Sequence, residues 1–363
     1  MTTTGVVAHL VLTALLLYLA WLTPKLSART VRFGVRVPDD RVDDPVVRRE
    51  TTRFRTTLLI SGVIIALIGV GLILTAGIAL MPVAIFVEII VWYLLYFRAN
   101  KAITAAKRDQ EWFAGVRQGV TADTTLRSDP PKFPWAWLLL PVLVVAASVV
   151  LGIIRYPALP DPLPVHFDLN GNPNRYAAKS IGSAFTVVFV QIGLTLVFGA
   201  IGVLVSRGPA DVDPARPASS VRAHREFIAR LGKAFIGFAT LVDLGLLGAD
   251  WAIWGGTAQT GVILPLTLGP ILVGIALLVM IVVQRNRDGD GKDEGTGLSH
   301  RDDDKNWIGG AIYRNANDPS WFVQRRFGFG WTVNIGNRVA LITCAGFVLV
   351  VIAFGALLPF VLR

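Results

Sequence analysis

The stretch RYPALPDPLPVHFDLNGNPNRYAAKSI, residues 155–181, is a polar connection between two long apolar runs. The chain around it has 363 residues, of which 53% are hydrophobic and 17% are charged, and its mean hydropathy is +0.57. An apolar run of about 20 residues, folded as a helix, spans the roughly 30 Å hydrocarbon core of a bilayer. The runs on both sides of residues 155–181 therefore predict membrane-spanning helices.

The same pattern recurs along the chain and predicts an all-α polytopic membrane protein with about eight transmembrane helices. The predicted spans are Gly5–Leu22, Leu58–Ile78, Leu80–Phe97, Trp135–Ile154, Gly182–Ser206, Ile228–Trp254, Val262–Gln284 and Val339–Leu362. The second and third spans are nearly continuous, so we expect them to fold back as a helical hairpin. A signal peptide has a basic segment before its apolar core. No basic residue precedes the first apolar run, so we expect it to be retained as a span.

The distribution of positive charge predicts the orientation of these spans. Four segments hold 31 of the 35 Lys and Arg residues, namely Thr23–Thr57, Arg98–Pro134, Arg207–Lys233 and Arg285–Arg338. These segments alternate with nearly uncharged connections. Because basic loops are retained on the cytoplasmic side, we expect a cell-membrane protein with both termini and residues 155–181 outside. This explains the net charge of +10 without nucleic acid, so the lipid bilayer is an expected partner and nucleic acid is not.

The spans and loops divide the chain into five predicted units. They are an N-terminal three-span unit (1–134), a two-span unit (135–206) around the outer loop 155–181, a two-span hairpin with a cytoplasmic linker (207–284), a cytoplasmic segment (285–338) and a final span (339–363).

The cytoplasmic segments differ in composition. Arg98–Gly119 contains good helix formers and is expected to extend the third span. Arg207–Ser220 contains three prolines and predicts a flexible linker. Asn286–Asp304 is rich in Gly and Asp and is typical of disorder. Lys305–Arg338 is rich in aromatic residues and Gly, which predicts a compact cap at the membrane surface.

The outer loop offers polar groups that suit ligand binding. The candidate ligand-binding residues are His166, Asp168, Asn170, Asn174, Arg175 and Lys179. Prolines favour an extended path off the fourth span, and Arg175 and Lys179 would share a face if a short helix leads into the fifth. The alternate spacing of Asp168, Asn170 and Asn172 resembles the start of a calcium loop. Pro173 and Lys179 occupy the glycine and glutamate positions of that loop, so no metal is expected. The alternative is a rigid turn whose polar groups satisfy one another.

Three acidic residues lie within predicted spans: Glu88, Asp243 and Asp250. Ionisable groups at bilayer depth usually face the bundle interior or a watery cavity. Asp243 and Asp250 are seven residues apart and share a helix face, and Glu88 is expected at a depth where it can meet Asp243. A proton or cation pathway and protonated acids that bond between helices are both open interpretations. Gln191 and His9 are further candidates for interhelical bonding.

The chain gives no sign of catalytic chemistry. A nucleophile–base motif, a P-loop or a dinucleotide fingerprint after a strand is not recognisable, so we expect neither an enzyme nor a cofactor. The single cysteine, Cys344, lies in an apolar run and is expected to be a small buried hydrophobe.

Two segments resemble known but uncharacterised families. The outer loop resembles the signature of DUF1648, a domain of unknown function in bacterial membrane proteins, through Leu159, Pro160, Pro164, His166, Phe167, Gly171 and Lys179. Asn174 stands where that family more usually has aspartate, which removes a charge. Lys305–Arg338 resembles DUF5808 through Trp307, Gly309, Gly310, Tyr313, Asn315, Asp318, Pro319, Phe322, Val323, Arg326, Phe327, Gly328, Gly330, Trp331, Thr332 and Asn334.

The first resemblance carries a functional expectation. Sdp-type immunity and signalling membrane proteins are relatives of DUF1648, which implies sensing or neutralising an exported peptide with a cytoplasmic repressor held at the membrane. We therefore expect a receptor or immunity-type protein whose outer loop engages an extracellular peptide or envelope ligand. Its cytoplasmic face would bind a regulatory protein or anionic lipid headgroups. The alternatives are a small transporter or proton-coupled permease that uses Glu88, Asp243 and Asp250, and a structural membrane protein without a ligand.

Overall fold

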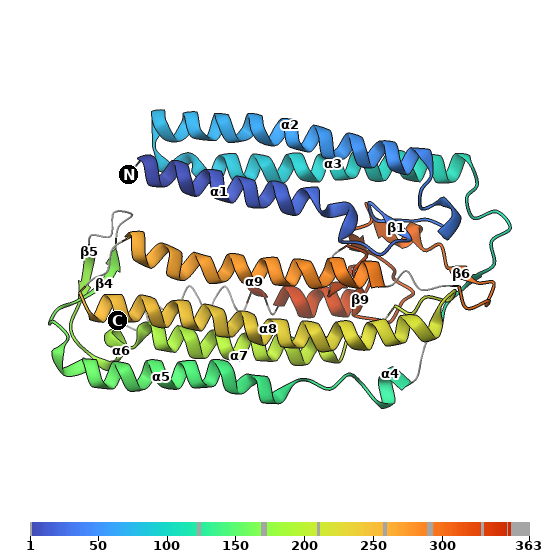
Figure 1. Ribbon diagram of the computed structural model, residues 1–363. Helices are drawn as coiled ribbons and strands as arrows, with labels where there is room; N and C mark the ends of the chain where they lie inside the picture. The colour runs from blue at the N-terminus through green and yellow to red at the C-terminus, as the bar shows by residue number, and fades with distance from the viewer. Residues whose placement is uncertain are drawn as a thin grey trace.

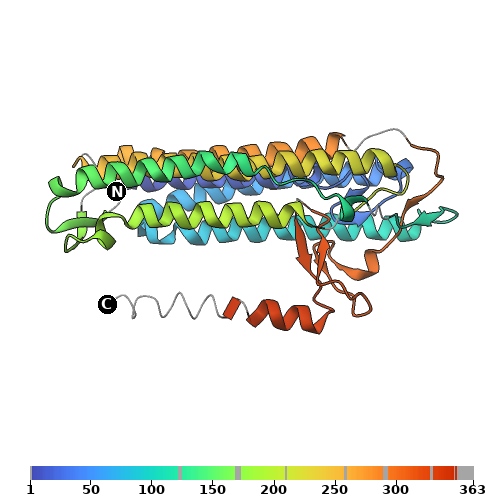
Figure 2. The ribbon, with the colours of Figure 1, turned by 90° about the horizontal axis from the view of Figure 1, so that it is seen from below.

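Long helices that run along a common direction dominate the computed structural model (Figure 1). It describes residues 2–121, 125–167, 173–208, 211–256, 260–288, 293–327, 330–346 and 348–349. The long helices are α1 (Thr2–Trp21), α2 (Pro45–Ala76), α3 (Met81–Asp109), α5 (Leu139–Arg155), α7 (Thr186–Ser206), α8 (Pro217–Trp254) and α9 (Thr260–Asp288). Two single-turn helices, α4 (Thr125–Ser128) and α6 (Ile181–Ala184), lie in connections. Residues 338–346 are also helical and run beside the bundle in Figure 2.

Six helices are long and apolar enough to cross a membrane. They correspond to the second to seventh predicted spans, and Gly5–Trp21 is a shorter apolar helix at the first. Apolar side chains on their outer faces, such as Leu67, Phe86 and Leu196, are exposed, as expected where lipid covers a helix. The mostly helical, multi-pass architecture is thereby confirmed. The count of eight stays a prediction, since Val339–Leu362 lies mostly outside the described residues.

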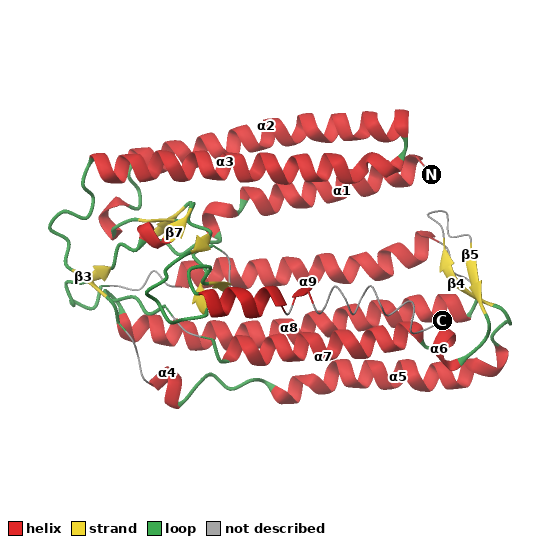
Figure 3. Cartoon of the chain, turned by 180° about the vertical axis from the view of Figure 1, so that it is seen from behind, coloured by secondary structure: helices red, strands yellow, loops and turns green. Residues whose placement is uncertain are grey.

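The helices form two groups. One contains α1, α2 and α3, and the other contains α5, α7, α8 and α9 (Figures 1 and 3). Glycines permit close approach within each group. A Cβ atom at Gly69 of α2 would lie 2.2 Å from His9 Nε2 of α1, and one at Gly245 of α8 would lie 2.0 Å from the Leu266 carbonyl oxygen of α9.

The predicted hairpin between the second and third spans is present. Helix α2 ends at Ala76, and Gly77 takes a φ of 91°, a conformation that residues with a Cβ rarely adopt. A 3-10 turn, Ile78–Leu80, then leads directly into α3. The expected continuation of the third span beyond the apolar run also occurs, although α3 ends at Asp109 rather than near Gly119.

Short antiparallel and parallel strand pairs add β structure that the all-α prediction lacked (Figure 3). At one end of the bundle, β4 (Leu163–Phe167) and β5 (Pro173–Ala177) form a hairpin. The other strands lie at the opposite end, and they are β1 (Val31–Arg32), β2 (Val35–Arg36), β3 (Gln118–Gly119), β6 (Ser299–His300), β7 (Trp307–Ile308), β8 (Ile312–Tyr313), β9 (Phe322–Gln324) and β10 (Trp331–Val333).

The prediction of disorder over Asn286–Asp304 is wrong for residues 286–288, which end α9, and for residues 293–304, which contact the rest of the chain. Strand β6 pairs with β3, and the Glu294 carboxylate accepts hydrogen bonds from the Ala218 and Ser219 backbone N–H groups at 3.0 and 2.9 Å. These are unpaired amides of the first turn of α8, where an acidic side chain is stabilising. Acidic residues that look like a solvated linker in the sequence instead satisfy donors from distant segments.

The linker predicted over Arg207–Ser220 is shorter than expected. Helix α8 begins at Pro217, well before the predicted sixth span, because proline is favourable in the first turn of a helix. Before it, Asp213 accepts from the Arg216 guanidinium at 2.6 Å, and Thr121 forms a β-bridge with Val212. Residues 211–216 therefore form contacts with other parts of the chain instead of a flexible linker.

Candidate functional site

The β4–β5 hairpin lies on an apolar base. Leu159 and Leu163 pack with Ala184, Val188 and Trp254, and all five side chains are buried. The Trp254 indole N–H of α8 donates to the Ala184 carbonyl oxygen at 3.4 Å. The hairpin is thus packed against the end of α8 rather than suspended in a loop.

The tip-side polar residues of the hairpin are exposed. His166 Nδ1 and Asn174 Oδ1 are 2.5 Å apart, and His166 is in register with Arg175 on the facing strand. The structure thereby brings together three of the six predicted ligand residues. Asp168 and Asn170 lie outside the described residues.

The fourth described residue, Lys179, has local partners. Its ammonium group donates to the carbonyl oxygens of Pro157 and Leu159 at 3.2 and 2.9 Å and lies 5.1 Å from the centre of the Tyr156 ring. Arg175 and Lys179 do not share a helix face, because Arg175 belongs to β5, which pairs with β4, and the short helix that leads into the fifth span, α6, begins only at Ile181. Lys179 therefore ties the end of the hairpin to the chain segment that leaves α5.

The intramembrane acids lie in separate helix groups. Glu88 belongs to α3, whereas Asp243 and Asp250 belong to α8, so Glu88 does not meet Asp243, although their similar depth would have allowed it (Figure 1). Glu88 is 3% exposed. Thr13 is beside it but outside hydrogen-bonding geometry, so both Glu88 carboxylate oxygens are unpaired among the described residues.

Asp243 is bound by α7. Thr195 Oγ1 donates to Asp243 Oδ2 at 2.7 Å, and the Gln191 side-chain amide donates to the Asp243 backbone carbonyl at 2.8 Å. Interhelical bonding by Gln191 is therefore confirmed. His9 plays the same part in the other group, where its Nε2 lies 3.3 Å from the Ala66 carbonyl oxygen of α2.

At the opposite end of the bundle, a run of three aspartates binds cations from distant segments. Lys107 of α3 donates to Asp302 Oδ1 at 2.7 Å and to Asp304 Oδ2 at 2.5 Å. The backbone N–H of Arg36 donates to Asp304 Oδ1 at 3.0 Å. We call Arg36, Lys107, Asp302, Asp303, Asp304 and Arg326 the polar clamp.

Arg326 lies at the centre of the polar clamp and is almost fully buried. Its guanidinium pairs with Asp303 and Asp304 and donates to the Gly34 carbonyl oxygen at 2.7 Å. Burial opposes ionisation of Asp303, but Arg326 and Arg36 outweigh it and lower the pKa of that carboxyl group. The polar clamp thus joins β1–β2, α3 and the segment after α9 through charge-assisted hydrogen bonds.

Asn334 organises the segment that carries Arg326. Its buried side-chain amide donates to the carbonyl oxygens of Asn315, Asp318 and Ser320 at 2.8, 3.1 and 3.2 Å. Its carbonyl oxygen accepts from the backbone N–H groups of Asn315 and Gly336, both at 3.0 Å. One side chain therefore closes the turns between β8 and β10, as expected of a compact cap.

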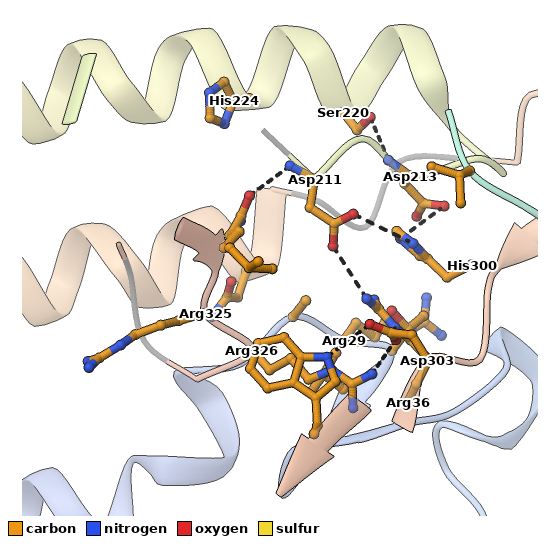
Figure 4. A pocket seen from close by; sticks show the side chains of 18 of the residues that line it. Arg29, Arg36, Asp211, Asp213, Ser220, His224, His300, Asp303, Arg325 and Arg326 are labelled. Atoms are coloured by element: carbon orange, nitrogen blue, oxygen red, sulfur yellow. Dashed lines mark hydrogen bonds and ion pairs between the residues drawn. The ribbon is translucent and has the colours of Figure 1, made fainter. Parts of the chain in front are cut away.

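A cavity of about 490 Å³ opens beside the polar clamp (Figure 4). Within it, Arg36 donates to Asp211 at 3.4 Å, and the Asp211 backbone N–H donates to Gln324 Oε1 at 2.7 Å. His300 lies between two carboxylates, with 3.9 Å from its Nδ1 to Asp211 and 3.6 Å from its Nε2 to Asp213. The cavity is large enough for a small polar ligand or for a partner's side chain.

The surroundings of His300 favour its neutral form. Burial and the positive charge of Arg36 lower its pKa, although Asp211, Asp213 and Asp39 act in the opposite direction. Because the native imidazole binds a proton more weakly than it does in the unfolded chain, the unfolded chain takes up more protons as the pH falls below about 6.5. The fold is therefore more stable with respect to His300 above about pH 6.5, and this stability is lost as the pH falls below that value.

The expected result is a pH-dependent opening of β6. Amide hydrogen exchange at Ser299, whose N–H donates to the Arg117 carbonyl oxygen at 2.9 Å, should show less protection at about pH 5.5 than at about pH 7.5 after correction for intrinsic rates. His300→Gln should remove this dependence, whereas His166→Gln on the exposed hairpin should not. If the exchange at Ser299 keeps the same pH dependence in His300→Gln, His300 is not the group that causes it.

The sequence reasoning missed the polar clamp. The signal was an Asp302–Asp304 run in a chain whose other loops at the same end carry excess Lys and Arg. Leaving three adjacent carboxylates without partners near a folded surface costs more free energy than pairing them with arginines from other loops. The partner residues themselves are not visible in the sequence, since Arg36 and Arg326 are 290 positions apart.

Two family models match parts of the chain. The model of a domain of unknown function, DUF1648, matches residues 143–192, and that of a family of unknown function, DUF5808, matches residues 316–341. Both predicted resemblances are confirmed. The first match covers most of α5, the hairpin and the start of α7, and the second covers β9, β10 and Asn334. No curated protein and no solved structure matches the chain.

These findings define the class of protein. The six long apolar helices and the DUF1648 match identify an integral, multi-pass membrane protein. The relation to Sdp-type immunity proteins stays a prediction.

Proposed function

We propose that this membrane protein is a receptor or immunity-type protein, in which the β4–β5 hairpin engages an extracellular peptide or envelope ligand. Helix α8 is the observation that carries the proposal. It has 38 residues, its Trp254 lies in the apolar base of the hairpin, and its N-cap Arg216 lines the cavity beside the polar clamp. A single continuous helix therefore connects the candidate ligand site with the opposite end of the bundle.

The proposal requires the polar clamp to be cytoplasmic. Its support is the charge distribution, since the segments at that end hold 31 of the 35 Lys and Arg residues. In this orientation, the cavity and the strands around it would bind a cytoplasmic regulatory protein. His166, Asn174 and Arg175 would contact the external ligand together with Asp168 and Asn170, and Lys179 would hold the hairpin in position.

Labelling of introduced cysteines tests the orientation. In a Cys344→Ser background, Tyr176→Cys on β5 should react with a membrane-impermeant thiol reagent in intact cells. Arg108→Cys, at the polar-clamp end of α3, should react only after the membrane is permeabilised. Both side chains are exposed in the structure, so burial does not explain a difference. The reverse pattern would contradict the proposed orientation and with it the external ligand.

Photo-crosslinking tests ligand capture. A photoreactive residue at Tyr176, which is 55% exposed, should yield a defined peptide or envelope adduct in intact cells, and His166→Ala should reduce its yield. The matched control is the same residue at Leu196 of α7, which is 67% exposed on an apolar helix face and should capture lipid. Identical adducts at both positions would contradict the receptor proposal.

A proton-coupled permease is the second candidate, and the carboxylate of Glu88, which has no hydrogen-bond partner among the described residues, favours it. Because Glu88 and the Asp243–Asp250 pair lie in different helix groups, a pathway through all three acids would need residues between the groups. If the protein is a receptor, Glu88→Gln and Asp243→Asn should both leave ligand capture by the hairpin unchanged. Loss of the protein's function in both variants, with normal protein levels, would favour transport.

A further inference from the structure

A groove of about 370 Å³ lies between the first turns of α8 and the last turns of α9. Its lining includes Arg222, Glu226, Phe227 and Arg230 of α8 and Ile281 and Arg285 of α9. Arg222, Glu226 and Arg230 of α8 are spaced four apart and so share one helix face, and Phe227 follows Glu226 directly. The groove therefore has basic side chains over an apolar floor.

The positive charge in this groove is not fully neutralised. Glu226 pairs with Arg230 at 3.0 Å. Arg222 and Arg285, in contrast, have no hydrogen bond or ion pair with any part of the chain that the structure describes. The nearby Glu294 carboxylate attracts Arg222 electrostatically, but its oxygens accept from the backbone amides at the start of α8 and it forms no ion pair with Arg222 within the described residues. Two guanidinium groups are thus available to an anion.

Arg285 is the more informative of the two, because it is half-buried. Its guanidinium carbon lies 4.5 Å from the centre of the Phe227 ring. Asp211 acts on it only from beyond ion-pair distance and is itself bound by Arg36 at 3.4 Å. The chain matches Arg36, Arg216 and Arg326 with carboxylates but leaves this one stacked on an aromatic ring. Stacked guanidinium groups with open donor edges suit bidentate binding of phosphate.

The surface of α9 next to Arg285 suits an acyl chain. Val273, Leu277, Ile281 and Arg285 recur every four residues and so form one stripe along the helix. Val273 and Leu277 are 51% and 37% exposed. The stripe is apolar over its length in the membrane span and ends at the guanidinium group, which is the arrangement of tail and headgroup in a phospholipid.

We propose that this groove is a binding site for an anionic phospholipid, with its phosphate on Arg285 and Arg222 and an acyl chain along Val273, Leu277 and Ile281. The site is independent of the receptor proposal, since it uses neither the hairpin nor the polar clamp. A bound lipid would fix α9 against the first turns of α8, next to the cavity that Arg285 also lines.

The test uses the full chain in phosphatidylcholine vesicles with and without phosphatidylglycerol, followed by extraction and native mass spectrometry of the lipids that stay bound. Wild-type protein should retain phosphatidylglycerol in preference to phosphatidylcholine. Arg285→Gln and Arg222→Gln should each weaken this retention by about tenfold, as expected for loss of a charge-assisted hydrogen bond. Arg222 is exposed, so its variant stays informative if Arg285→Gln does not fold.

The matched control is Arg108→Gln, which removes the same charge from an exposed arginine at the same end of the bundle, outside the groove. It should leave retention unchanged. An equal loss in Arg108→Gln would show diffuse surface attraction and overturn the site. Equal retention of the two lipids would overturn anionic selectivity, and displacement of phosphatidylglycerol by inorganic phosphate would show that the groove recognises free phosphate instead of a lipid.

Discussion

Arg326→Met should open the polar clamp at a cost of about 3–5 kcal/mol, the usual effect of removing one partner from a buried ion pair. The Arg326 side chain is only 3% exposed, and its loss leaves Asp303, Asp304 and the Gly34 carbonyl oxygen without their common donor. Methionine approximates its length and retains a contact with Trp307, over which the guanidinium now stacks at 4.8 Å. The effect should therefore report lost charge pairing more than lost packing.

Hydrogen exchange at the Arg36 amide is the direct measurement, because this N–H donates to Asp304. Its protection should fall by about a hundredfold or more in Arg326→Met. Arg325→Met is the matched control, because Arg325 is the exposed neighbour of Arg326 and the substitution removes the same charge. Similar loss of protection in both variants would mean that net charge, rather than the buried pairing, stabilises this end of the bundle.

Asn334→Asp should unfold the turns around β9 and β10. The substitution has nearly the same shape, but it replaces an NH₂ group with an oxygen that faces three carbonyl oxygens at 2.8 to 3.2 Å. Three acceptors lose their donor, and a buried carboxylate is placed against them. Each unsatisfied buried group costs about 1–3 kcal/mol, so the summed penalty of several kcal/mol approaches the whole stability of a small structural unit.

Limited proteolysis of the purified chain measures this effect. Cleavage should appear within residues 313–336 in Asn334→Asp and be slow in the wild-type protein. Asn317→Asp provides the control, since it introduces the same charge into the same turn at an exposed position. Equal cleavage of the two variants would show that added charge, and not the lost donor, opens the segment.

Both predictions concern the joint between the two helix groups. Arg326 and Asn334 belong to a segment that contacts β1–β2 and α3 of one group, while Gln324 of the same segment binds Asp211 just before α8 of the other. Gly34 and Gly310 are in backbone contact, because a Cβ atom at Gly34 would lie 2.5 Å from the Gly310 Cα. The confirmed DUF5808 resemblance thus coincides with the part of the chain that fastens the two groups together.

The sequence was most informative where one physical effect dominates. Apolar run length predicted the spans, since a backbone in hydrocarbon must satisfy its own hydrogen bonds as a helix. The hairpin between α2 and α3 followed from an apolar run too long for a single crossing, although its turn at Gly77 lies within the predicted second span. The motif residues at His166 and Asn334 were also recognisable from the chain alone.

The sequence was misleading where polar groups find partners at a distance. Asp302–Asp304 has the composition of a flexible linker, yet it is ordered by Lys107, Arg36 and Arg326. Arg175 has helical spacing with Lys179, yet it lies in a strand because β4 supplies its backbone partners. In both cases local composition was a weaker influence than hydrogen bonding to residues far away in the chain.

By itself, then, the sequence determined a multi-pass helical protein, the alternation of basic and uncharged connections, and the two family resemblances. Only the tertiary structure decided which charges are paired, that Glu88 and Asp243 lie in different helix groups, and that Arg285 stacks on Phe227 without an ion pair among the described residues. The physical reason is that burial of apolar length is a property of consecutive residues. Charge pairing and helix contact depend on which distant segments the fold brings within hydrogen-bonding distance.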